Sequence, residues 1–147
     1  MKIIVIADSH GNIANLKHVM EFGKKIKVGA IIHCGDWDNV KAVETVLLSG
    51  IPLYTVLGNA DIDPKIAKKL EVKSKKFTQN YLEFELDNKR IGVVHNVDFL
   101  PKVDILFCGH SHKQYKKDNI VNPGALEYGI NFAIYDTKTD ELEFIHE

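Results

Sequence analysis

The sequence has almost no arginine. Arg90 is the only arginine among 19 basic residues, so lysine supplies the rest of the positive charge. Because the arginine side chain is the usual bidentate partner of phosphate, a site that handles phosphate here needs another source of positive charge. The 20 acidic residues bring the net charge to -1. The chain therefore lacks the overall positive field that would draw it to nucleic acid or to a membrane surface.

Cysteine and long apolar runs are also scarce. Cys34 and Cys108 lie inside apolar runs, which indicates buried, reduced thiols rather than a disulfide framework. No apolar run approaches the ~20 residues of a membrane-spanning helix. The N-terminal MKIIVIADSHGN reaches Asp8 too early for a signal peptide and is interpreted as a buried strand. We therefore expect a soluble, cytoplasmic protein that does not enter a membrane.

The first half of the chain alternates between strand and helix patterns. Continuous apolar runs typical of buried strands occur at 2–8, 30–36 and 52–59. Between them, segments 12–25 and 39–50 have helical spacing, and Asn12 is a candidate N-cap. This order predicts right-handed crossovers and a parallel sheet. The nucleotide-binding motifs G-x-G-x-x-G and G-x-x-x-x-G-K-[ST] are absent, which argues against a Rossmann or P-loop protein.

The second half has a different pattern. Strands and hairpins are predicted at 81–95, 104–110 and 131–147. In the first of these, Leu82, Phe84 and Leu86 alternate with polar residues, as in an antiparallel hairpin with one wet face. The chain shows no internal repeat and no linker. We therefore expect an α/β protein, a single domain over residues 1–147 in which two packed sheets have helices outside them.

Five predicted strands end in a side chain that can bind a metal: Asp8, Asp36, Asn59, His95 and His110. His10 and His112 each lie two residues beyond such an end. Ligands in open α/β sheets bind beyond the carboxyl ends of strands, which favours one shared site. Each residue alone has an ordinary alternative role, since aspartate caps helices and forms turns and histidine pairs with backbone groups. Seven such positions together favour the site.

Aspartate, asparagine and histidine form a donor set that suits Mn²⁺, iron or Zn²⁺. Seven donors exceed what one tetrahedral zinc ion needs. Two ions ~3.5–4 Å apart that share a bridging carboxylate would use them well. Such a pair would also neutralise a phosphoryl group in a chain with a single arginine. A phosphate-handling site of this kind would need no arginine.

These residues lie in motifs that resemble a known family. The segments DSH (8–10), GD (35–36), GNAD (58–61), His95 and GHSH (109–112) resemble, in order, the five motifs of calcineurin-like metallophosphoesterases. The segment NPG (122–124) also matches their small, single-domain bacterial and archaeal phosphodiesterase branch. The resemblance covers nearly the whole chain. It implies a four-layer αββα sandwich, with two mixed β-sheets flanked by helices.

The resemblance also implies a role for each residue of the motifs. One metal ion would be held by Asp8, His10 and His112, the other by Asn59, His95 and His110, and Asp36 would bridge them. The ions would be divalent, with Mn²⁺ expected and Ni²⁺, Fe²⁺ or Zn²⁺ as alternatives. The implied reaction is attack of a metal-bridging hydroxide on phosphorus. Asp36, Asn59 and His95 are the residues expected to be catalytic. The implied substrate is a small phosphoester or a nucleotide-type molecule, without stable binding of nucleic acid, and a homodimer stays open.

Two positions depart from the family pattern. Ala60 stands where many members have a histidine that protonates the leaving oxygen, which favours a phosphodiesterase with good leaving groups over a fast monoesterase. Asp61 then loses its partner, and a helix N-cap is its alternative role. Asn96 replaces a usual glycine, and the short segment 96–102 predicts an open, poorly selective site. Because of these departures, one alternative function stays open. The chain would then be a protein-interaction module with weak or no catalytic activity, like the retromer subunit that resembles this family.

Two further features have two interpretations each. Trp37 either stacks on an aromatic leaving group or packs in the core. The lysine-rich segment 65–76 is either a solvated helix with Ile66 and Leu70 facing the core or a basic rim for a polyanionic substrate.

Overall fold

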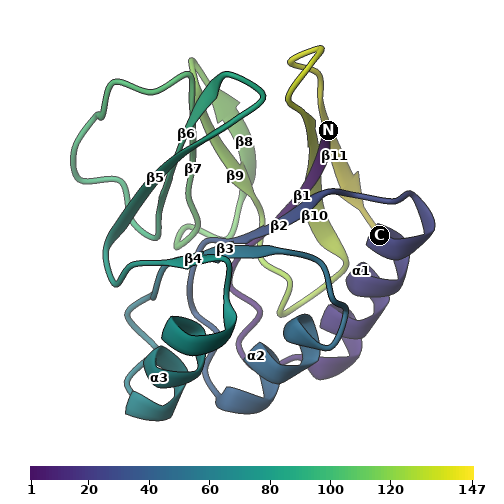
Figure 1. Ribbon diagram of the computed structural model, residues 1–147, viewed down its shortest axis with the longest axis vertical. Coiled ribbons are helices and arrows are strands. Elements are labelled where there is room, and N and C mark those ends of the chain that lie inside the picture. Colours follow the sequence, from purple (N-terminus) through teal and green to yellow (C-terminus); the bar gives the residue numbers. More distant parts are fainter.

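Two β-sheets pack face to face in the computed structural model, which describes residues 1–147, and three helices cover one of them (Figure 1). The helices are α1 (Ile13–Lys25), α2 (Val40–Leu47) and α3 (Pro64–Lys73). The first sheet has the strand order β11 (Leu142–His146), β10 (Asn131–Asp136), β1 (Lys2–Ile6), β2 (Ala30–His33), β3 (Leu53–Thr55) and β4 (Lys76–Phe77). The second has the order β5 (Tyr81–Leu86), β6 (Lys89–Val94), β7 (Ile105–Phe107), β9 (Ile120–Pro123) and β8 (Gln114–Lys117).

Both sheets are mixed. In the first, β1 is parallel to β2 and antiparallel to β10. In the second, β6 is parallel to β7 and antiparallel to β5. These pairings confirm the α/β fold with two mixed sheets and the hairpin of segment 81–95. The final hairpin joins the first sheet beside β1, so the two ends of the chain meet in one sheet.

Alternation along β1 explains the layers. Ile4 and Ile6 pack against the helices in one buried cluster, whereas Ile3 and Val5 pack against the second sheet in another. Successive side chains of a strand point to opposite faces, so a continuous apolar strand is required where both faces are covered. The first sheet is therefore the middle layer of the molecule.

Local signals place the helix starts. Asn12 accepts the Asn15 N–H at 3.0 Å, which confirms it as the N-cap of α1. Asp63, not Asp61, caps α3 by accepting the Lys65 N–H at 3.0 Å. The lysine-rich segment does form a helix with Ile66 and Leu70 fully buried, as the first interpretation of it predicted. No helix is long and apolar enough to span a bilayer.

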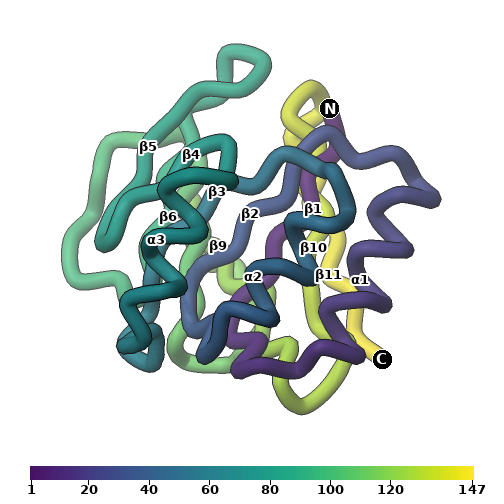
Figure 2. The backbone as a smooth tube through the Cα atoms, turned by 60° about the horizontal axis from the view of Figure 1, so that its bottom comes forward, coloured from purple at the N-terminus to yellow at the C-terminus, as the bar shows by residue number.

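The helical layers differ from those of the expected four-layer sandwich. All three helices lie side by side on the first sheet (Figure 2), and the chain after Lys73 forms only strands and loops. The outer face of the second sheet carries a small cluster around Leu106, against which Val97 and Val103 pack. These two residues belong to the connection between β6 and β7, which forms no helix. A loop therefore takes the place of the fourth layer.

Packing between the sheets can be tested at Phe107. Its side chain is fully buried between the sheets and meets Tyr135 edge to face at 5.7 Å between ring centroids. Phe107→Ala should lower the free energy of unfolding by about 3–5 kcal/mol, because a large buried cavity remains. The control Leu100→Ala, at a side chain that is 75% exposed, should change it by less than about 0.5 kcal/mol. Urea unfolding in the presence of a chelator measures both, and equal effects would contradict this packing.

Candidate metal centre

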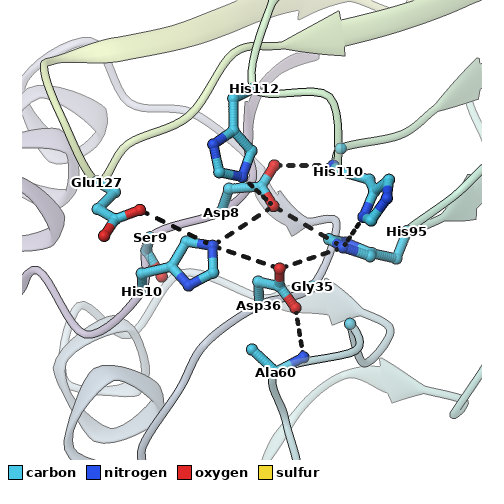
Figure 3. Close-up of polar contacts among 12 residues, drawn as sticks. Asp8, Ser9, His10, Gly35, Asp36, Ala60, His95, His110, His112 and Glu127 are labelled. Atoms are coloured by element: carbon cyan, nitrogen blue, oxygen red, sulfur yellow. Dashed lines mark hydrogen bonds and ion pairs between the residues drawn. The ribbon is translucent and has the colours of Figure 1, made fainter.

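The structure brings all seven predicted residues together. Figure 3 shows six of them converging from the loops that follow β1, β2, β6 and β7: Asp8, His10, Asp36, His95, His110 and His112. Asn59, which follows β3, joins them because its Oδ1 lies 3.1 Å from Nε2 of His95. The carboxyl ends of parallel strands thus place these side chains at one edge of both sheets, as the strand-end pattern predicted.

The donor atoms form two groups with Asp36 between them, and Oδ1 of Asp8 also lies 3.8 Å from Nε2 of His95. In one, Oδ1 of Asp8 lies 3.5 Å from Nε2 of His112 and 3.9 Å from Nε2 of His10. In the other, Nε2 of His95 lies 3.3 Å from Nδ1 of His110 and close to Asn59. Oδ2 of Asp36 is 3.3 Å from Nε2 of His10 and 3.3 Å from Nε2 of His95. One carboxylate oxygen therefore faces both groups.

Backbone N–H groups fix both carboxylates. Oδ2 of Asp8 accepts the N–H of His110 at 3.0 Å, and Oδ1 of Asp36 accepts the N–H of Ala60 at 2.9 Å. Each carboxylate therefore turns its other oxygen toward the cluster. Oδ1 of Asp8 and Nε2 of His10 are buried without a hydrogen-bond partner. Because buried polar atoms are nearly always paired, two such atoms facing one another fit a bound cation.

Two histidines are oriented through their far nitrogen. Nδ1 of His95 donates to the carbonyl of Cys34 at 2.8 Å, and Nδ1 of His10 donates to Oδ1 of Asp38 at 3.0 Å. In the neutral ring this leaves the Nε2 lone pair directed at the cluster, which is the arrangement of metal-binding histidines. Asp38 was not predicted from the sequence, although it lies in the same GDWD segment as Asp36. Glu127 was also missed, and its carboxylate lies 4.0 Å from Nε2 of His10.

The backbone at the site adopts an uncommon conformation. Five of the seven residues have positive φ: Asp8 (51°), His10 (43°), Asp36 (66°), His110 (70°) and His112 (64°). Residues other than glycine rarely do so, and each costs on the order of 1 kcal/mol. Strain gathered in this way indicates a functional site, because the surrounding structure must hold it.

Charge at the cluster favours a cation. Burial raises the pKa of Asp8. Burial acts on Asp36 in the same direction, but the neighbouring His95 imidazole and the hydrogen bond from the Ala60 N–H lower the pKa of this carboxyl to about 2. Burial opposes protonation of His95, yet Asp36 raises its pKa above the ordinary value. The carboxylates therefore create a negative potential where the imidazoles converge.

His33 and Trp37 lie beneath the site. Nδ1 of His33 accepts the N–H of Gly35 at 3.0 Å, so Nε2 donates to Oγ of Ser9 at 2.9 Å. Burial lowers the pKa of His33 to about 3, which keeps this ring neutral. Trp37 is fully buried, stacks on His33 at 3.7 Å and donates to Thr55. Trp37 is therefore a core residue, and its interpretation as a substrate-stacking residue is wrong.

Asp61 joins two of the loops. Its Oδ2 accepts the N–H groups of Asp36 and Gly58, both at 2.9 Å, and its Oδ1 accepts the N–H of Asp38 at 2.9 Å. The alternative role of helix N-cap is wrong for this residue. Gly58 must stay without a side chain, because a Cβ there would overlap the Asp36 carboxylate. Asp61 thus holds the backbone on which Asp36 and Asp38 are placed.

A cleft of about 460 Å³ opens beside Asn59, His95 and His110. Its other walls come from residues 79–81 and from the segment after His95, including Phe99. The short segment 96–102 was expected to leave the site uncovered, but it supplies one wall of this cleft.

The chain is similar to known phosphoesterases. The family profile for the calcineurin-like phosphoesterase superfamily domain matches residues 1–140. A phosphodiesterase of Methanocaldococcus jannaschii, MJ0936, is 21% identical over 138 residues, and the match covers 84% of this chain and 83% of that protein.

Solved structures have the same fold. The structure of an archaeal phosphodiesterase is 20% identical, with 100% of both chains covered and a TM-score of 0.86. YfcE, a phosphoesterase from E. coli, is 19% identical, with 99% of this chain and 98% of that chain covered and a TM-score of 0.72. Vps29 from Entamoeba histolytica, in complex with zinc, is 16% identical, with 100% and 97% covered and a TM-score of 0.66.

The role of Asp61 can be tested with a conservative change. Asp61→Asn leaves a single acceptor oxygen for three N–H groups and should lower the free energy of unfolding by about 2–3 kcal/mol, because buried donors lose their partner. Mn²⁺ affinity should fall by about tenfold. Asp63→Asn is the matched control, since asparagine caps helices as well as aspartate does. Unfolding in chelator and calorimetric Mn²⁺ titration measure the two effects. Identical behaviour of both variants would contradict the role of Asp61.

Proposed function

The chain belongs to the calcineurin-like phosphoesterase superfamily, and from this premise we propose that it is a dinuclear metal-dependent phosphodiesterase. The position of Asp36 carries the proposal. One of its oxygens lies 3.3 Å from an imidazole nitrogen of each donor group, which is where a carboxylate shared by two ions belongs.

The donor set fits two divalent ions. Asp8, His10 and His112 would hold one ion, Asn59, His95 and His110 the other, and Asp36 would hold both. If bound there, two such ions would draw electron density from a phosphoryl group and would lower the pKa of bound water. Oxygen and imidazole donors suit Mn²⁺, which we propose as the metal, with Ni²⁺, Fe²⁺ and Zn²⁺ as alternatives.

The protein groups around the donors favour a diester. The cleft beside Asn59 has no lysine or arginine among its lining residues, so it suits the uncharged second organic group that a diester has and a monoester lacks. Position 60 has no side-chain acid, and its N–H is bound to Asp36. The leaving oxygen therefore departs without a proton from this residue. Diesters with acidic leaving groups should react fastest for both reasons.

A protein-interaction module is the second candidate. Ala60 favours it, since the site lacks the acid that many members of the family carry. The strained backbone and the two unpaired donor atoms favour the enzyme, because an interaction surface needs neither. Turnover separates the two candidates, because Vps29 from Entamoeba histolytica was solved with zinc and bound metal alone fits either. A module would hydrolyse no phosphodiester in excess Mn²⁺.

Asp36→Asn tests the proposed reaction. Asparagine can still accept the Ala60 N–H, so the variant should fold, but it cannot supply a charged oxygen to both donor groups. Hydrolysis of bis(p-nitrophenyl) phosphate with Mn²⁺ should fall by more than about a hundredfold. This is a larger loss than expected for a residue that only hydrogen-bonds a metal ligand. Asp118→Asn is the control, because Asp118 also has positive φ but lies in the β8–β9 turn. Unchanged turnover in a folded Asp36→Asn protein would contradict the proposal.

The two-ion assignment predicts separate effects of two histidines. His110→Ala and His112→Ala should each reduce Mn²⁺ from about two ions to about one per chain, because each removes a donor from a different group. Equilibrium dialysis with elemental analysis measures the content. The double variant should bind less than either single variant. If both single variants kept two tightly bound ions, the assignment would be wrong.

A further inference from the structure

The cleft of about 460 Å³ lies on one side of the donor cluster. It is lined by Asn59, His95 and His110 but by none of Asp8, His10 and His112. Its volume falls in the range of small-molecule sites. A diester whose phosphorus lies near Asp36 would therefore place one of its organic groups in this cleft. What the cleft accepts decides which diesters the protein prefers.

One wall of the cleft is aromatic. Tyr81, at the start of β5, meets Phe99 edge to face, with ring centroids 5.1 Å apart. The Tyr81 hydroxyl donates to Glu83 at 2.6 Å, which fixes that ring in place. Phe99 is 45% exposed, although it is among the most apolar side chains. A flat ligand that stacked there would cover this surface.

Four other residues of the cleft wall have polar side chains that carry no positive charge. The amide side chains of Gln79, Asn80 and Asn96 line the cleft, and each offers both donors and an acceptor. None of the 12 lining residues is lysine or arginine, and Asp98 adds a carboxylate. A purely apolar group would leave the amides without partners. A second phosphate would face Asp98 without a compensating cation.

We propose that this cleft is a nucleoside subsite, in which Phe99 stacks on the base, Tyr81 contacts it edge-on, and Gln79, Asn80 and Asn96 bind its polar edge. This inference rests on the proposed phosphodiesterase function and specifies its substrate as a nucleoside phosphodiester without further phosphates. A nucleobase has a flat face for the aromatic wall and donors and acceptors for the amides, which satisfies both kinds of lining group.

Three diesters with one leaving group test the subsite. The p-nitrophenyl esters of thymidine 5′-phosphate, phenyl phosphate and methyl phosphate differ only in the group that would enter the cleft. With Mn²⁺, kcat/KM for the thymidine ester should exceed that for the methyl ester by about tenfold, with the phenyl ester between them. Equal values for the thymidine and methyl esters would overturn the inference. A phenyl ester as good as the thymidine ester would also overturn it.

Variants locate the preference. Phe99→Ala should bring kcat/KM for the thymidine ester close to that for the methyl ester, mainly by raising the KM of the thymidine ester. Phe99→Tyr should keep the preference. Gln79→Ala should lower the thymidine-to-phenyl ratio, because it removes an amide but leaves the aromatic wall. Leu100→Ala is the matched control, since Leu100 lies in the same loop and outside the cleft. If Phe99→Ala and Leu100→Ala showed the same thymidine-to-methyl ratio of kcat/KM, the aromatic wall would not contribute to the preference, and the proposed subsite would be wrong.

A binding measurement separates this inference from the proposed reaction. Thymidine added to the metal-free protein should shift the NMR signals of Tyr81 and Phe99, and Phe99→Ala should abolish the shift at Tyr81. If the methyl ester is hydrolysed in an Asp36-dependent way but the thymidine preference is absent, only the subsite is wrong. If no ester is hydrolysed, the reaction is wrong, and the thymidine shifts alone decide the subsite, with no shift overturning it.

Discussion

The arrangement of the site depends on how Asp36 is held. The Ala60 N–H fixes one oxygen of its carboxylate, and the other oxygen is left between His10 and His95. Asp61 binds the Asp36 N–H from a neighbouring loop, so the residue is fixed through its backbone as well as its side chain. Moving this one carboxylate by an ångström would remove it from one donor group or the other. The loop that carries Asp36 and the loop that carries Ala60 and Asp61 therefore have to keep a fixed position relative to each other.

The packing of the sheets provides that placement. The first sheet is covered on both faces, by the helices and by the second sheet, so its strand ends have little freedom. The ends of β1, β2 and β3 bring Asp8 with His10, Asp36 and Asn59 to one edge. The ends of β6 and β7 bring His95, His110 and His112 to it from the second sheet. A rigid frame of this kind can hold several residues at positive φ, because the cost on the order of 1 kcal/mol for each is small against the burial of two apolar clusters.

The sequence predicted the donors and missed their supports, for a physical reason. A strand end is marked by a local change from apolar to polar residues, so Asp8, Asn59 and His95 stand out by position alone. Asp61 acts through hydrogen bonds to loops distant in the chain, and no periodic pattern reports such contacts. The cleft was missed for the same reason, since its walls join the start of β5 to the segment after β6. The full burial of Trp37 identifies it as a core residue, and amino-acid composition does not reveal whether a given tryptophan is buried.

The scarcity of arginine divides the work of the site in two. Positive charge for a phosphoryl group would come from ions bound at the donor cluster. There the lone pairs of carboxylate oxygens and imidazole nitrogens face one another. The neighbouring cleft has no cation and presents aromatic and amide groups, so it can recognise only the uncharged part of a substrate. A phosphodiester meets both conditions, because it carries a single negative charge at phosphorus and an uncharged organic group on each side. A polyphosphate would bring further negative charge into the cleft, where the protein has no cation to oppose it.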